Sequence, residues 1–116
     1  MSGPRILSGA VVFAEPIPAG GGTVRVVLED TTRADAAATV VAQSVEPLTR
    51  PLAAGGRLPF RLTVPELDEH ARYNVRVHVD RSGSGEISAG DRITTRAYPV
   101  LTQGAGDHVE VEVVEI

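Results

Sequence analysis

Side chains that could hold a metal ion are concentrated in the segment from Asp80 to Asp91. Calcium prefers several hard oxygen ligands, and calcium loops supply them from alternate residues around a tight turn. In this segment Gly85 stands at the sharp turn and Asp91 at the closing acid position. The side-chain oxygens that the pattern selects belong to Asp80, Ser82, Ser84, Glu86 and Asp91. The segment therefore predicts a weak calcium site, and the sequence suggests no other cofactor.

The same segment departs from a standard calcium loop in several ways. Serine replaces the usual Asp or Asn at two ligand positions, and Asp91 is shorter than the usual bidentate Glu. The flanking residues alternate as strands do, whereas the standard loop joins two helices. The alternative is an exposed hairpin loop, rich in Gly and Ser, that binds no ion. Both interpretations stay open at this point.

The three histidines offer a second metal pattern. His78 and His108 are expected on polar strand faces, and they would meet if their strands are neighbours. With Glu110 they could then hold zinc, although their spacing matches no zinc motif and solvated side chains are the alternative. His70 lies in an acidic loop and has no assigned role. Glu110 and Glu112 are expected together on a polar strand face, where Arg76 is available as a cross-strand partner.

Several functional classes find no support. The chain has no cysteine, which excludes disulfides, thiolate metal sites and cysteine nucleophiles. No serine occurs in a Gly-x-Ser-x-Gly turn, and the glycines at 20–22 lead into a strand without the Lys-Ser/Thr ending of a phosphate loop. The net charge is −4, the arginines form no cluster, and two Phe and two Tyr are too few for a stacking platform. We therefore expect neither an enzyme nor a nucleic-acid partner.

Apolar and polar residues alternate along most of the chain, which is typical of half-buried strands. Runs rich in glycine separate the alternating segments and predict tight turns. The predicted strands are 6–14, 23–29, 39–45, 58–64, 73–79, 92–97 and 109–113. A single helical turn is expected over 66–71. About seven short strands predict a single-domain antiparallel β-sandwich over residues 1–116, with a small β-barrel as the alternative.

Membrane-spanning and export signals indicate where a protein is located. No apolar run is long enough to span a membrane, so membrane insertion is not expected. Residues 1–5 contain neither the apolar stretch of a signal peptide nor a lipid-accepting cysteine. These features predict a soluble, cytoplasmic protein, or a protein of the cell envelope if an export segment was removed.

Several short motifs follow one another in an order and spacing that match a known family. They are Leu7-Ser8-Gly9, Val24–Leu28, Ala34-Asp35-Ala36, Val40-Val41-Ala42, Phe60-Arg61-Leu62, Tyr73–Val77 and Tyr98–Thr102. In this order they resemble the YbaY-like, type III secretion pilotin-like (YscW-like) lipoprotein family over nearly the whole chain. The resemblance implies a β-sandwich and a non-enzymatic envelope role, in which pilotin-like members act as chaperones or escorts for a partner protein. Exported members carry a signal peptide and a lipidated cysteine, and this sequence shows neither.

These observations lead to three functional hypotheses. The first is a non-catalytic accessory domain that engages a protein or peptide partner through a sheet edge or groove, with Val40–Val45 as the candidate edge. The second is a structural β-module stabilised by calcium in the Asp80–Asp91 loop. The third is a small-ligand carrier or an enzyme, either of which would need a deep pocket. The identity of the partner and the oligomeric state are not specified by the sequence.

Overall fold

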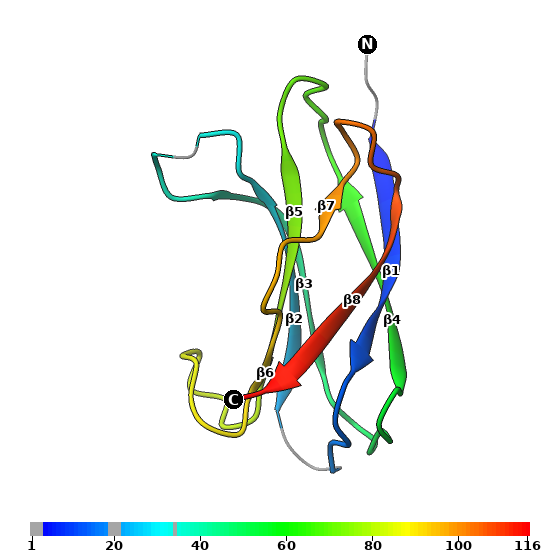
Figure 1. The fold of residues 1–116 in the computed structure, drawn as a ribbon, viewed down its shortest axis with the longest axis vertical. Helices are drawn as coiled ribbons and strands as arrows, with labels where there is room; N and C mark the ends of the chain where they lie inside the picture. Colours follow the sequence, from blue (N-terminus) through cyan, green and yellow to red (C-terminus); the bar gives the residue numbers. More distant parts are fainter. Residues whose placement is uncertain (1–3, 19–21, 34) are drawn as a thin grey trace.

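The computed structural model describes residues 4–18, 22–33 and 35–116, and these residues form strands and no helix. Figure 1 shows the strands arranged in two facing layers. The strands are β1 (Arg5–Phe13), β2 (Thr23–Asp30), β3 (Thr39–Pro47), β4 (Arg57–Val64), β5 (Tyr73–Asp80), β6 (Arg92–Ile93), β7 (Pro99–Val100) and β8 (His108–Glu115). The predicted all-β fold is confirmed, and the helical turn expected over 66–71 is an irregular loop.

The two layers are joined along one side and open along the other. One layer is β4-β1-β8, and the other is β3-β2-β5 with the short strands β6 and β7 added to β5. Because β6 also pairs with β8, the strands follow one continuous path that begins at β3 and ends at β4. Where Ser44 and Glu46 of β3 approach Leu58, Pro59 and Phe60 of β4, a narrow hollow of about 10 Å³ lies between the two strands. The fold therefore combines the predicted sandwich with a nearly closed barrel.

Two features of the pairing differ from the sequence-based expectation. The strands β1 and β8 run parallel, whereas every other strand pairing is antiparallel. The two strands are the first and last of the chain, so no hairpin constrains their relative direction. The strand expected over 92–97 is shorter and is followed by β7. Side-chain oxygens cause the interruption, because Thr94 Oγ1 and Asn74 Oδ1 accept the backbone N–H groups of Val77 and Tyr98.

The core follows directly from the alternation of residues along the strands. Along β4, β5 and β8 every second side chain points between the layers, and most of these side chains are buried, whereas β3 has no buried residue. The largest fully buried side chains are those of Leu7, Val11, Phe13, Ile17, Val26, Leu28, Val64, Val75, Val77, Val79, Val100 and Val111. Valine dominates this set because β-branched side chains pack well on a pleated surface.

Gly9 in β1 allows a close approach between the neighbouring strands of the sheet β4-β1-β8. It lies opposite Phe60 of β4 and Val109 of β8. A Cβ added to Gly9 would lie 2.0 Å from the carbonyl oxygen of Val109 and 2.7 Å from the Phe60 ring. The missing side chain therefore makes room for the Phe60 ring to cover the strand.

Candidate functional site

The loop between β5 and β6 is closed by its two aspartates, as the sequence pattern implied. Asp80 is the last residue of β5, and Asp91 directly precedes β6. The carboxylate of Asp80 accepts the backbone N–H groups of Gly83 at 3.0 Å and Gly85 at 2.7 Å. It also accepts the hydroxyl of Ser82 at 3.3 Å. Asp80 thus holds the first half of the loop in a tight turn.

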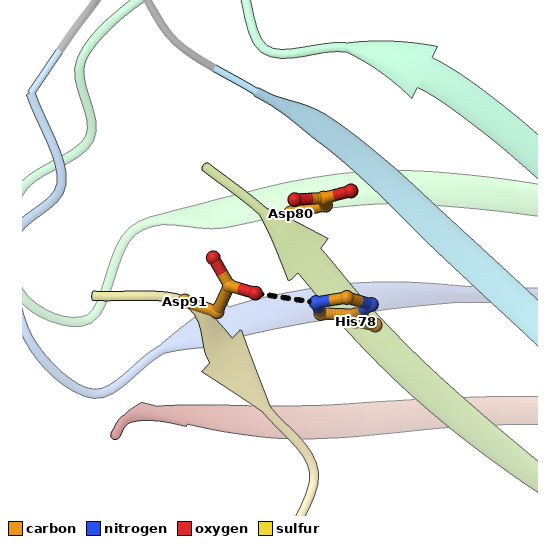
Figure 2. A group of neighbouring side chains, drawn as sticks. All are labelled: His78, Asp80 and Asp91. Carbon is orange, nitrogen blue, oxygen red and sulfur yellow. Dashed lines mark hydrogen bonds and ion pairs between the residues drawn. The ribbon is translucent and has the colours of Figure 1, made fainter. Parts of the chain in front are cut away.

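Asp91 is fully buried at the base of the same loop. One carboxylate oxygen accepts the N–H of Arg81 at 2.9 Å, and the other accepts the N–H of Ser88 at 3.1 Å. The second oxygen also lies 2.7 Å from Nε2 of His78 (Figure 2). Because an ionised carboxylate can only accept, Nε2 of His78 carries the proton in this bond. Asp91 therefore ties both ends of the loop to the outer face of β5.

His78 is a member of this cluster that the sequence analysis placed in the wrong environment. It was expected on a solvated strand face, but its exposed fraction is 8%. The outer face of β5 is covered at this point because the loop folds back over it. A signal was present in the sequence, since residues two apart on a strand share a face and His78 stands two positions before Asp80. One ligand atom from each of His78, Asp80 and Asp91 lies within 4.8 Å of the others, and the described residues form no other such group.

Hydrogen bonding keeps both aspartates ionised. The backbone N–H of Gly85 is the main cause of the lowered pKa of Asp80, with further lowering by Gly83 and Ser82. Burial by itself would raise the pKa of Asp91. The hydrogen bonds from His78 and from two backbone N–H groups outweigh burial and hold the pKa of Asp91 below its ordinary value of 3.8.

The other predicted calcium ligands lie on the exposed part of the loop. The Ser82 hydroxyl lies 3.0 Å from that of Ser84, and Ser84 donates in turn to the carbonyl of Glu86 at 3.2 Å. Ile87 in the same part of the loop is also exposed, at 57%. Hydrogen bonds among its own residues thus organise the loop. Calcium ligation by Asp80, Ser82, Ser84, Glu86 and Asp91 stays a prediction.

The base of the loop is also attached to the C-terminal residues. Gly90 donates its N–H to the carbonyl of Ile116 at 2.9 Å, and Ile116 donates to the carbonyl of Asp91 at 3.0 Å. The buried guanidinium of Arg92 donates to the carbonyl of Pro16 at 2.9 Å and to the carbonyl of Gly90. The loop therefore supports the junction between β6 and β8, where the two layers join.

The structure does not bring the remaining predicted partners together. His78 of β5 pairs with Ile93 of β6, and Ile93 pairs with Val114 near the end of β8. His108 is the first residue of β8, so the two histidines lie at opposite ends of the sheet. The ring of His108 bonds instead to the Ser8 hydroxyl at 3.2 Å. The zinc hypothesis for this histidine pair was therefore wrong.

The expected ion pair between Arg76 and Glu110 was also wrong. Arg76 pairs with Glu29 on the neighbouring strand, at 3.0 and 3.2 Å, while Glu110 pairs with Arg57. The strand order explains these two ion pairs. Glu29 reaches Arg76 because β2 is next to β5, and Glu110 reaches Arg57 because only β1 lies between β8 and β4.

The two strands at the ends of the sheet path differ in how their free edges are protected. Edge strands expose unpaired backbone groups, and proline or charged residues usually block them. β4 contains Pro59 with exposed Arg57 and Arg61, so this edge is protected. β3 has no charged residue from Thr39 to Val45, and the Val40 and Val45 side chains are 51% and 49% exposed.

A register shift in β3 separates part of its edge from β4. The pairing skips Val41, which lies between the partners of Leu28 and Glu29. A bulge of this kind bends a strand, and in Figure 1 the β2–β3 hairpin leans away from the other layer. Farther along, Ser44 and Glu46 border the narrow hollow next to β4. The stretch Thr39–Gln43 is therefore the accessible part of the predicted edge.

Comparison with known proteins agrees with this architecture. Residues 4–113 match the family described as Type III secretion system lipoprotein chaperone (YscW). The chain belongs to this YscW family. A solved structure of an alternative pilotin from the type II secretion system of Vibrio cholerae is also similar, with 26% identity and a TM-score of 0.78 over 97% of each chain. No curated protein matches the chain.

Membership of the YscW family bears on the expected class of function. A chaperone acts by binding another protein, so the family supports a non-catalytic, partner-binding role. The family name also associates such chains with lipoproteins of secretion systems. The described residues form no helix long and apolar enough to cross a bilayer.

Proposed function

We propose that this YscW-family protein is a non-catalytic binding module that takes up an extended segment of a protein partner along β3. The observation that carries the proposal is the contrast between the two edges. The free stretch Thr39–Gln43 has no charge and no proline, whereas Pro59 and two arginines protect β4. An added strand would gain backbone hydrogen bonds from the edge and side-chain contacts with the exposed Val40.

The partner that best fits this proposal is a component of a secretion apparatus in the cell envelope. The descriptions of the YscW family and of the similar pilotin both name secretion systems, which supports this class of partner. An envelope location for the chain is part of the same proposal.

Site-specific photo-crosslinking in the native host tests the proposal. A photoreactive amino acid replaces Val40 on β3, and the matched control places it at Thr63 on the protected strand β4, where the side chain is also exposed. We expect position 40 to crosslink to one defined segment of one secretion-system protein and position 63 to give no such product. Equal crosslinking from the two positions, or crosslinking from position 63 alone, would contradict the use of β3.

Calcium binding in the Asp80–Asp91 loop is a second candidate, favoured by the convergence of these two carboxylates from opposite ends of the loop. Thermal unfolding in EDTA, in millimolar calcium and in millimolar magnesium tests it. A site with ligand at 100 times its dissociation constant gains about 2.7 kcal/mol. A calcium-specific rise in Tm that Asp80→Ala abolishes would support the site, and identical Tm values in the three solutions would remove it.

A further inference from the structure

A pocket that no hypothesis above uses lies at the start of β5, between the end of β2 and β7. The exposed Ala97 and Pro99 form its apolar wall, and the buried Tyr73 borders it. Its polar rim is formed by Arg72, Asn74 and Gln103, together with threonines from the adjoining loops. Most of the lining residues are polar, and apolar surface lies beside them, so the hollow suits a ligand that has both a polar group and an apolar part.

The polar rim of this pocket consists of hydrogen-bond donors that the protein does not use. Within the described part of the chain, the guanidinium of Arg72 and the side-chain amide of Gln103 make no hydrogen bond or ion pair. Asn74 uses its Oδ1 to accept the N–H of Tyr98 at 2.6 Å, which leaves its NH₂ group as the free end. One positive charge and two amide groups therefore border an apolar wall, and such a set complements a carboxylate.

The neighbouring acidic residues do not cancel this positive charge. Glu29 is already neutralised by two hydrogen bonds from Arg76. Asp30 accepts the N–H and the hydroxyl of Thr32, so its carboxylate already has hydrogen-bond partners. A second carboxylate arriving at Arg72 would thus meet an unpaired cation.

The backbone beside the pocket is strained and firmly held. Leu101 has φ 72° and is the centre of a turn in which Thr102 donates to the carbonyl of Val100 at 2.8 Å, which makes it the rarer, strained form of γ-turn. Gln103 also has positive φ, at 58°. The buried Leu101 side chain and the bond from the Thr102 hydroxyl to the Ala71 carbonyl, at 2.6 Å, maintain this conformation. Strained backbone of this kind is concentrated at ligand-binding sites. Here the contacts that maintain it also hold the backbone of Gln103 in place.

We propose that this pocket binds an acidic peptide, with a Glu or Asp carboxylate on Arg72, Asn74 and Gln103 and an adjacent apolar side chain against Ala97 and Pro99. The inference rests on the proposed protein-binding function for its class of ligand. The pocket is separate from the β3 edge, since Val40, Glu29, Asn74 and Pro99 follow one another across four strands. A partner could therefore contact the pocket, the edge or both.

Titration of the isotopically labelled full chain, followed by amide NMR shifts, tests the proposal. The probe is the dipeptide acetyl-Leu-Glu-amide, and its neutral counterpart is acetyl-Leu-Gln-amide. We expect the acidic probe to shift resonances of Asn74 and Gln103 in a saturable manner and to bind about fivefold more tightly than the neutral probe, as for a single exposed ion pair. Arg72→Gln should remove this difference, while Arg50→Gln, an exposed arginine elsewhere, should leave it unchanged.

Three results would overturn the proposal: equal affinity for the two probes, shifts confined to other surfaces, or binding of inorganic phosphate with no response to the acidic dipeptide. The variant Val40→Lys distinguishes this site from the β3 edge. It should leave dipeptide binding unchanged even where it abolishes binding of the partner. Loss of dipeptide binding at the pocket and loss of partner binding at β3 can therefore be told apart.

Discussion

Replacement of Asp91 by Ala should destabilise the protein substantially, because one side chain satisfies three donors. The N–H groups of Arg81 and Ser88 and the Nε2–H of His78 all bond to this carboxylate. A buried donor that loses its acceptor costs about 1–3 kcal/mol. Ser88 is exposed and Arg81 is half-buried, so both can find water after a small movement of the loop, whereas His78 cannot. We therefore expect a loss of about 3 kcal/mol, the upper end of the cost of one buried donor, with smaller contributions from the two N–H groups that can reach water.

Urea unfolding monitored by circular dichroism measures this loss, and thermal unfolding gives a second reading. For a domain of this size about 3 kcal/mol corresponds to a decrease in Tm of about 10–20 °C. The matched control is Glu86→Ala in the same loop, whose exposed side chain makes no hydrogen bond among the described residues and should change stability by less than about 0.5 kcal/mol. A loss below about 1 kcal/mol for Asp91→Ala would refute the role of this carboxylate in closing the loop.

Three further predictions concern the packing of Gly9, the contacts of Arg92 and the ionisation of Asp80 and Asp91. Gly9→Ala should cost about 3 kcal/mol in urea unfolding, because a Cβ would meet the neighbouring carbonyl at 2.0 Å, while Gly106→Ala, which meets nothing within 4 Å, should be nearly neutral. Arg92→Met should accelerate amide exchange at the β6–β8 junction, since its guanidinium holds two carbonyls there, and unchanged exchange would contradict this role. The lowered pKa values of Asp80 and Asp91 add stability that is complete above pH 3.8 and is lost as the pH falls below it. Urea midpoints between pH 3 and pH 6 should show this loss, and Asp91→Ala should reduce it.

The strands were predictable because the requirement for one apolar face leaves a period of two in the sequence. The segment Tyr73–Val79 shows this most clearly, and β5 spans it with one further residue. The parallel pairing of β1 with β8 left no comparable signal, because it depends on long-range closure of the sheet rather than on any hairpin. The division between β6 and β7 was also hidden, since it arises from side-chain hydrogen bonds of Thr94 and Asn74.

The candidate sites were predictable in part. Oxygen spacing drew attention to Asp80 and Asp91 as calcium ligands, and that stays a prediction; the structure shows both carboxylates accepting N–H groups of the loop. The burial of His78 was missed because a strand pattern does not show which loop will fold over a strand face. The β3 edge was visible as a lack of charge. The pocket beside β7 was not, because its lining comes from segments that meet only in the folded chain.

The most direct test of the account is the affinity of the identified partner segment for three forms of the protein, measured by isothermal titration calorimetry. The forms are the unaltered chain, Val40→Lys on β3 and Thr63→Lys on β4. A lysine on an edge strand disfavours addition of another strand. If the partner adds to β3, Val40→Lys should weaken binding at least tenfold and Thr63→Lys should change it less than twofold. Equal effects of the two substitutions, or a larger effect of Thr63→Lys, would contradict the assignment of β3 as the binding edge.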